Sequence, residues 1–299
     1  FDAIRLWHNS KTNGRPTVVN MSWGYFSRRS DNPDAGTYRG TPWTDTVRQT
    51  DKGMIGRPGD FRHVVRVGSV DTDIEEMIDE GIHIVVAAGN TYQKIDVTGG
   101  IDYDNYYTKT GVGNVYYHRG GSPYSTEAHI VGNVDSTVHI DGLEQKAASS
   151  ETGPGVSVYA PGTDIMSAMS TTNIFGATVV SNPYPDNANF LINNISGTSM
   201  AAPQVSGVLA LWLQINPAAT PAQALAFINS TAKTAQLYQT GLTNDYTDAR
   251  SLLGSTNRFA FNKFNSNVQM RLGAPAAAAA APVATYALSS SVASVNEGS

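Results

Sequence analysis

Ser199 stands in local chemistry that suits a nucleophile. It follows a strand-like run at residues 190–192 and precedes a long apolar helix expected over residues 205–215. A glycine-containing turn exposes the hydroxyl, and a helix N-terminus offers unpaired N–H groups and partial positive charge. Such a setting stabilises an oxyanion formed when the serine attacks a carbonyl. A helix cap is the alternative, and it is the commoner role for a serine there.

The motif around this serine, GTSMAAP at residues 197–203, has a specific resemblance. It is similar to the nucleophile motif of the subtilisin-like serine peptidases, the subtilases. It differs from the Gly-x-Ser-x-Gly elbow of the α/β-hydrolases, because Ala201 replaces the second glycine. Pro203 is expected in the first turn of the helix, where the N–H groups have no helical partner.

Three further motifs resemble subtilase landmarks and occur in the family's order. VVNMSWG at residues 18–24 is similar to the substrate-cleft strand, and VVAAGN at residues 85–90 to the strand that ends at the oxyanion-hole asparagine. VSVYAPG at residues 156–162 is similar to the family's Ala-Pro-Gly turn. With the serine motif, the resemblance covers roughly residues 1–235, so the chain is identified as a member of the subtilases.

The resemblance implies a role for each matching residue. Ser199 attacks the scissile carbonyl, while the Asn90 side-chain amide and the Ser199 backbone N–H stabilise the oxyanion. A polypeptide substrate pairs with two cleft walls, formed by Ser22, Trp23 and Gly24 on one side and by Ala88 and Gly89 on the other. Trp23 replaces a leucine common in the family. Its side chain is expected either in the cleft, where it narrows the apolar subsites, or in the core.

A serine nucleophile needs a general base, and the base needs an orienting carboxylate. The resemblance places them in Asp-(Ser/Thr)-Gly and His-Gly-Thr motifs upstream of residue 18, and neither motif occurs in the chain. His63, near Asp60, is a disfavoured substitute; His8 belongs to a structural helix, and His83 is expected to be a satisfied core histidine. We therefore expect an N-terminally truncated peptidase domain that is inactive alone, with Asp and His upstream.

The secondary structure predicted around these motifs indicates an α/β fold. A helix over residues 3–8 precedes a buried strand at 17–22, and a helix over 70–80, capped by Asp71 or a neighbour, precedes a strand at 82–88. Further strands are predicted at 129–134, 137–140 and 156–159. This alternation predicts a mainly parallel sheet with right-handed crossovers. The resemblance implies a partial three-layer subtilisin-like domain over residues 1–270, with an insertion at about 25–68.

The composition changes after the peptidase-like region. Residues 271–284 form an Ala/Pro-rich linker, and residues 285–299 resemble the first strand of a truncated β-sandwich module of cell-surface and phage proteins. Gln204 and the stretch 116–121 resemble subtilase-like domains of virus-borne proteins. We expect an extracellular or virion-associated location within a larger multidomain or virion protein. The alternative function is a non-catalytic structural module of a phage or surface protein.

Composition excludes several other classes of protein. The chain has 299 residues, 40% hydrophobic content, a net charge of −5 and no cysteine. These values exclude disulfides and thiol catalysis and give no reason to expect nucleic-acid or membrane partners. No cofactor is expected. For the segment 102–105, with Asp102 and Asp104 at alternate positions, an Asx turn is favoured and a calcium loop is the alternative.

Overall fold

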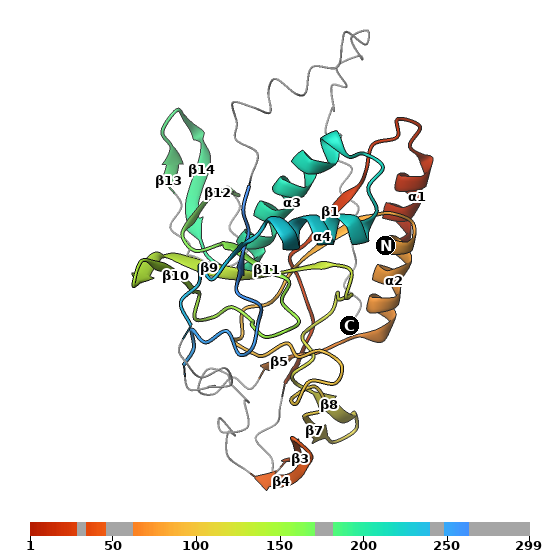
Figure 1. The fold of residues 1–299 in the computed structure, drawn as a ribbon, viewed down its shortest axis with the longest axis vertical. Coiled ribbons are helices and arrows are strands. Elements are labelled where there is room, and N and C mark those ends of the chain that lie inside the picture. The colour runs from red at the N-terminus through yellow and green to blue at the C-terminus, as the bar shows by residue number, and fades with distance from the viewer. Residues whose placement is uncertain (29–33, 46–61, 171–181, 240–247, 263–299) are drawn as a thin grey trace. The chain divides into compact units, whose positions relative to one another are not determined.

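The computed structural model describes residues 1–28, 34–45, 62–170, 182–239 and 248–262 (Figure 1). All of them belong to one compact unit, Phe1–Lys263, and a second unit, Phe264–Ser299, lies outside the described residues. The expected linker at 271–284 and the final strand at 285–299 also lie outside the described residues.

A mainly parallel sheet forms the centre of the described unit. Its strands lie in the spatial order β1 (Val18–Met21), β6 (His83–Ala87), β9 (His129–Ile140), β11 (Val158–Pro161), β16 (Arg258–Phe259) and β15 (Lys233–Thr234). Neighbours from β1 to β16 pair in parallel, whereas β15 and the β9 partner β10 (Leu143–Lys146) run antiparallel. The α/β class is confirmed. The two strands predicted within residues 129–140 form one continuous strand, β9.

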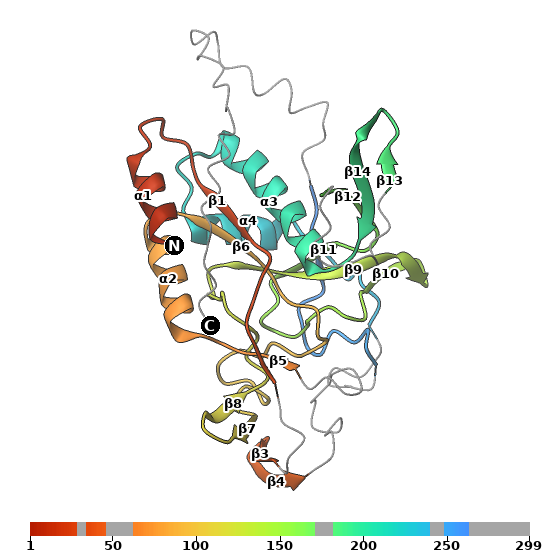
Figure 2. The same ribbon diagram turned by 180° about the vertical axis from the view of Figure 1, so that it is seen from behind.

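Helices flank the sheet (Figures 1 and 2): α1 (Asp2–Ser10), α2 (Gly68–Asp79), α3 (Thr198–Ile215) and α4 (Pro221–Thr231). Ile84 and Val86 of β6 pack in one core cluster with Ile74 and Met77 of α2. Because side chains alternate along a strand, Val85 points to the other face, and α3 also contacts β6. Burial on both faces explains why β6 reads as an unbroken apolar run.

The start of α2 corrects one expectation. Its N-cap is Val67, with no side-chain cap, and Asp71 lies in the first turn. Asp71 instead accepts from the Arg66 Nε at 2.6 Å and from the Ser122 hydroxyl at 2.7 Å. It therefore ties the helix to the segment beside the cleft rather than capping the helix.

Three small antiparallel sheets surround the main one. One has the order β4 (Thr41–Asp45), β3 (Asp34–Tyr38), β7 (Tyr106–Lys109) and β8 (Gly113–Tyr116); another pairs β2 (Phe26–Arg28) with β5 (Arg62–Val64). The third joins β12 (Ile165–Met169), β14 (Asn187–Ile195) and β13 (Asn182–Tyr184). The described parts of the expected insertion thus pair with strands from the tyrosine-rich segment after β6, and Trp43 packs there against Tyr107 and Tyr117.

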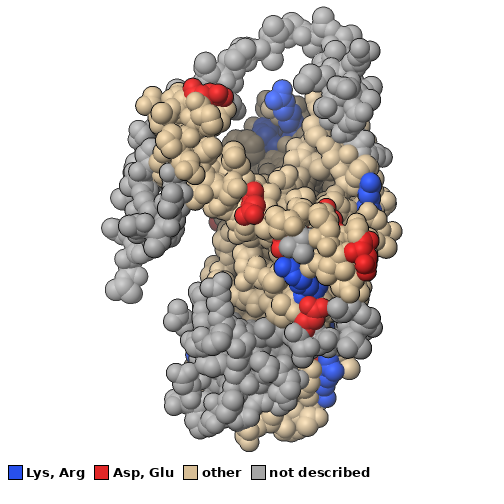
Figure 3. All heavy atoms as spheres, turned by 90° about the vertical axis from the view of Figure 1, so that its left-hand side faces the viewer, with Lys and Arg blue, Asp and Glu red and all other residues tan. Residues whose placement is uncertain are grey.

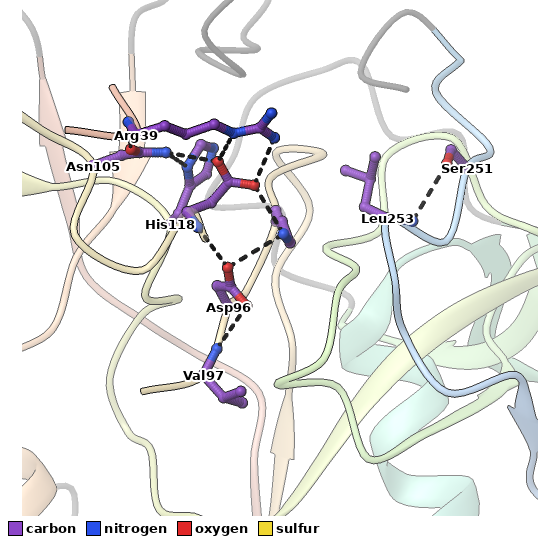
Figure 4. Close-up of polar contacts among 9 residues, drawn as sticks. Arg39, Asp96, Val97, Asn105, His118, Ser251 and Leu253 are labelled. Atoms are coloured by element: carbon purple, nitrogen blue, oxygen red, sulfur yellow. Dashed lines mark hydrogen bonds and ion pairs between the residues drawn. The ribbon is translucent and has the colours of Figure 1, made fainter. Parts of the chain in front are cut away.

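A buried charged cluster links the sheet of β4, β3, β7 and β8 to the loop after β6 (Figure 4). The Asp102 carboxylate accepts from the Lys94 ammonium at 2.8 Å and from the Arg39 Nε at 2.7 Å. Burial alone raises a carboxyl pKa, but hydrogen bonds from Arg39 and Lys94 outweigh it and hold the pKa of Asp102 well below its usual range. Protein cations already occupy this carboxylate, and the described residues contain no acidic or histidine cluster suited to a metal ion. The calcium alternative therefore gains no support.

Among the described residues on the face in Figure 3, charged side chains form no large patch of one sign. On that face, the Lys, Arg, Asp and Glu side chains of the described residues are scattered among uncharged ones. Among the described helices, none combines the length and apolarity needed to cross a bilayer.

His83, at the start of β6, is buried, but its Nδ1 has no hydrogen-bond partner among the described residues, which corrects the expectation of a satisfied histidine. Burial lowers the pKa of His83 to about 4. The unfolded chain therefore binds more protons between pH 6.5 and 4, and we expect about 3 kcal/mol of stability to be lost as the pH falls through that range. Urea unfolding of His83→Leu should show a smaller acid loss, whereas the exposed His139→Leu control should retain the wild-type loss. Equal losses in both variants would contradict this origin.

Candidate active site

Parallel strand ends bring the two expected cleft walls together. β1 pairs with β6 in parallel, so residues following both strands emerge at the same edge of the sheet. One cavity of about 230 Å³ lies at this edge. Its lining includes all the residues expected at the site: Ser22, Trp23, Gly24, Ala88, Gly89, Asn90 and Ser199.

Ser199 is the second residue of α3 and is not its cap. The N-cap is Gly197, and Thr198 is the first helical residue. In the part of the chain that the structure describes, neither the Ser199 hydroxyl nor its backbone N–H has a hydrogen-bond partner. The unpaired N–H is one of the orphan donors at a helix start, and it lies where partial positive charge gathers.

Pro203 acts differently from the expectation. It is the sixth residue of α3, so its missing N–H leaves the Ser199 carbonyl without the usual helical partner. The Ser22 hydroxyl fills this role, donating to the Ser199 carbonyl at 3.2 Å. The proline thus frees a carbonyl through which the turn at residues 197–199 is connected to Ser22.

Asn90 lies beside the turn at residues 197–199, with its carboxamide oriented by Thr198. The Thr198 backbone N–H donates to Asn90 Oδ1 at 2.9 Å, and the Thr198 hydroxyl donates at 3.1 Å. These bonds engage the oxygen, while Nδ2 donates to no described residue. A Cβ on Gly197 would lie 3.3 Å from Asn90 Nδ2, so the free donor sits directly over the turn that precedes Ser199.

Two glycines allow the turn at residues 160–162 and the turn at residues 197–199 to approach each other closely. Gly197 has φ 153°, a conformation that favours glycine, and its N–H donates to the Gly162 carbonyl at 2.8 Å. A Cβ on Gly162 would lie 2.6 Å from the Gly197 carbonyl oxygen. The Ala-Pro-Gly turn therefore packs against the serine turn, and a side chain at residue 162 would displace it.

Trp23 belongs to the cavity wall and not to the core. Its side chain is 45% exposed and packs edge-on against Tyr25, with ring centroids 5.7 Å apart. Phe26 also lines the cavity, whereas no Asp, Glu, Lys or Arg does so among the described residues. The cavity suits an apolar side chain, because a charged group would lose hydration there without gaining a partner.

No histidine lines this cavity among the described residues. His63 is buried in β5, where its Nδ1 lies 3.0 Å from the Gln93 amide nitrogen, and Asp60 lies outside the described residues. His8 hydrogen-bonds to the Thr17 hydroxyl at 2.7 Å. The described site therefore presents a serine hydroxyl and two unpaired N–H donors, without a histidine or carboxylate lining the cavity beside the serine.

Sequence comparisons identify the relatives of this chain. The profile of the subtilase family matches residues 2–261. The alkaline serine exoprotease A of Vibrio alginolyticus is 27% identical over 207 residues, which cover 69% of this chain and 28% of that protein. The extracellular serine proteinase of Thermus sp. (strain Rt41A) is 32% identical over 155 residues, which cover 52% of this chain and 27% of that protein. The aligned region thus spans just over a quarter of each relative.

A comparison of structures finds similar chains as well. The crystal structure of a cold adapted subtilisin-like serine proteinase aligns with a TM-score of 0.47 and 20% sequence identity. The alignment covers 88% of this chain and 60% of that one.

Proposed function

Because the chain belongs to the subtilase family, we propose that it carries the nucleophile half of a serine endopeptidase that hydrolyses peptide bonds through an acyl-enzyme on Ser199. The observation that carries this proposal is the convergence of Ser199 and Asn90 at one cavity, with the Ser199 N–H and the Asn90 Nδ2 both unpaired among the described residues. Two unpaired donors beside an unpaired hydroxyl suit a reaction that creates an oxyanion.

The acyl-transfer roles follow from this arrangement. The Ser199 Oγ attacks the scissile carbonyl, and the developing oxyanion accepts from the Ser199 N–H and the Asn90 Nδ2. Thr198 fixes the Asn90 carboxamide through its oxygen, so the amide group need not reorganise as charge develops. A substrate backbone lies between Ser22–Gly24 and Ala88–Gly89 and adds a strand to these walls.

The proton acceptor must come from residues that the described site lacks. We propose that the His and Asp of the family lie upstream, outside these 299 residues, so that this chain alone is inactive. β1 supports this placement, because within the described chain it pairs only with β6 and offers a free edge. A groove of about 430 Å³, lined by Ile4, Trp7, Val18 and Val19 among others, runs beside that edge. A further parallel strand pairing there would end at the same edge of the sheet as Ser22.

The biological setting is also a proposal. The Thermus relative is named as an extracellular proteinase, and the virus-like features at residues 116–121 and 204 favour a phage-borne parent. We therefore propose an extracellular or virion-associated protein in which residues 271–284 link the peptidase domain to a β-module that begins at residue 285.

Peptide hydrolysis by the full-length natural product tests the proposal. We expect cleavage of a chromogenic peptide with an apolar residue before the scissile bond, and a loss of at least about 10⁴-fold in Ser199→Ala. Ser206→Ala, on a later turn of α3, is the control and should retain activity. Absence of cleavage, or equal cleavage by Ser199→Ala, would instead support the structural-module alternative.

Trp23 is expected to limit the size of the substrate side chain that the cleft accepts. Replacing Trp23 with the smaller leucine enlarges the cavity. The kcat/KM for a peptide with a large apolar residue, divided by that for the alanine peptide, should therefore rise about 10-fold. Two peptides differing at one apolar position give the ratio. The control Tyr184→Leu, at an exposed aromatic residue of β13 that does not line the cavity, should leave the ratio unchanged. An unchanged ratio in Trp23→Leu would place the substrate side chain elsewhere.

A further inference from the structure

The segment that follows Asn90 is buried although it forms no helix or strand. Asn90 is exposed, whereas residues 92–96 are all buried. Buried backbone groups outside regular structure need partners, since an unpaired one costs free energy. Here the partners come from residues 149–152, nearly sixty positions along the chain: the Tyr92 N–H donates to the Ser149 carbonyl at 2.9 Å, and the Thr152 N–H donates to the Gln93 carbonyl at 3.0 Å.

Glu151 supplies the central contacts between the segment at residues 89–93 and the segment at residues 149–152. Its Oε1 accepts from the Thr91 N–H at 3.1 Å and also from the Thr91 hydroxyl, and its Oε2 accepts from the Gln93 N–H. Its own backbone N–H donates to the Gly89 carbonyl at 3.0 Å. Glu151, which is buried, therefore contacts Gly89, the residue before Asn90, and also Thr91 and Gln93 after it.

We propose, building on the function proposed above, that Glu151 is a positioning residue for the oxyanion site: its carboxylate holds the turn at residues 89–93 so that the Asn90 amide faces the carbonyl attacked by Ser199. Glu151 touches neither the substrate nor Ser199 and acts through Asn90. The carboxylate binds the backbone on which Asn90 stands, while Thr198 orients the Asn90 side chain. The two restraints are complementary: Glu151 fixes the position of the Asn90 Cα, and Thr198 fixes the orientation of the Asn90 carboxamide.

Gly89 shows how tightly this turn is fitted to Glu151. Its φ is +119°, which L side chains rarely adopt, and a Cβ there would lie 2.6 Å from the Glu151 Cγ. The turn thus approaches the glutamate side chain as closely as a backbone without Cβ allows. We therefore expect a displaced Glu151 side chain to shift Gly89, the residue that precedes Asn90.

The hydrogen-bond donors around Glu151 suit its role as an acceptor. Lys146 is buried beside the segment, donates to the Ala147 and Ser150 carbonyls and lies 4.7 Å from the centre of the Tyr92 ring. Burial raises the pKa of Glu151 to about 7, against the opposing effects of the hydrogen bonds from Thr91 and Gln93 and of the Lys146 ammonium. Arg250 and Asp248 are the other charged groups near this pair. The three donors from Thr91 and Gln93 match an ionised carboxylate, which only accepts hydrogen bonds.

A double-mutant cycle in the full-length peptidase tests the proposal. In Glu151→Gln the new amide nitrogen faces an N–H donor, so the turn must shift, and we expect kcat to fall about 10-fold or more with KM little changed. In the Asn90→Ala background the same substitution should cost less than about twofold, because the group it positions is gone. Glu127→Gln, an exposed glutamate, should be neutral in both backgrounds. An equal loss in both backgrounds would overturn the proposal and indicate a general structural role.

Hydrogen exchange of the 299-residue chain provides a second arm that needs no activity. Glu151→Gln should speed exchange of the Thr91 and Gln93 amides at least about 10-fold and leave the α3 amides of Val205 and Leu209 unchanged. Thr91→Val, which removes only the hydroxyl donor, should shift the same amides less and serves if Glu151→Gln does not fold. Unchanged exchange at both amides would overturn the positioning role. An inactive wild type with the expected exchange would instead contradict only the proposed peptidase function.

Discussion

In the full-length protein, if it has the proposed peptidase activity, Asn90→Ala is expected to lower kcat about 10²- to 10³-fold while KM changes little. This magnitude is the one known for the oxyanion-hole asparagine of a subtilisin. In the proposed oxyanion role, the Asn90 Nδ2 meets a full negative charge only in the transition state, so its removal should cost little in the substrate complex. Single-turnover kinetics of the variant measure the effect on the chemical step.

The matched control is Asn187→Ala, an exposed asparagine at the start of β14. It should retain wild-type kcat. If Asn90→Ala instead raised KM at constant kcat, Asn90 would bind the ground state, and the oxyanion role would be wrong.

Asp102→Ala is expected to destabilise the fold by about 3–5 kcal/mol, because it breaks a buried ion pair and leaves its partner charged. Lys94 is only 4% exposed at its side chain and would retain Asp96, at 3.2 Å, as its acidic neighbour. Arg39 is 31% exposed and can turn to water. The cost therefore falls mainly on Lys94. Urea unfolding measures this free energy.

Asp104→Ala is the control two residues away. Asp104 is 84% exposed and pairs with Arg119 at 2.6 Å. An exposed pair of this kind contributes roughly 0–1 kcal/mol. If both variants lost the same stability, the buried cluster would contribute no more than a surface ion pair, contrary to the expectation for Asp102.

The helices and central strands were predictable because local patterns determine them. β6 reads as an apolar run since both its faces are covered, and α2 shows one apolar stripe. The parallel order of β1 and β6 followed from the strand–helix–strand alternation. Two strands predicted within 129–140 merged into β9 because the polar residues between them lie where β9 extends past β11 and pairs with β10.

The site residues were predictable from motifs, but the hydrogen bonds that hold them in place were not. Ser199 and Asn90 each lie in a recognisable motif, yet nothing local connects Asn90 to Glu151, which is brought to the turn only by the pairing of β9 with its neighbours. The same holds for the Ser22 hydroxyl on the Ser199 carbonyl, which depends on a contact across 177 positions. From its sequence neighbours, Ser150 and Thr152, Glu151 would be predicted to be exposed, and only the tertiary structure shows that it is buried.

Covalent labelling tests the central claim most directly. We expect a fluorophosphonate probe, applied to the full-length natural product, to form an adduct that mass spectrometry of the digested protein locates on Ser199. Ser199→Ala should remove the adduct, and Asn90→Ala should slow its formation. An unlabelled wild type, or an adduct that persists in Ser199→Ala, would contradict the claim that Ser199 is the nucleophile of a peptidase.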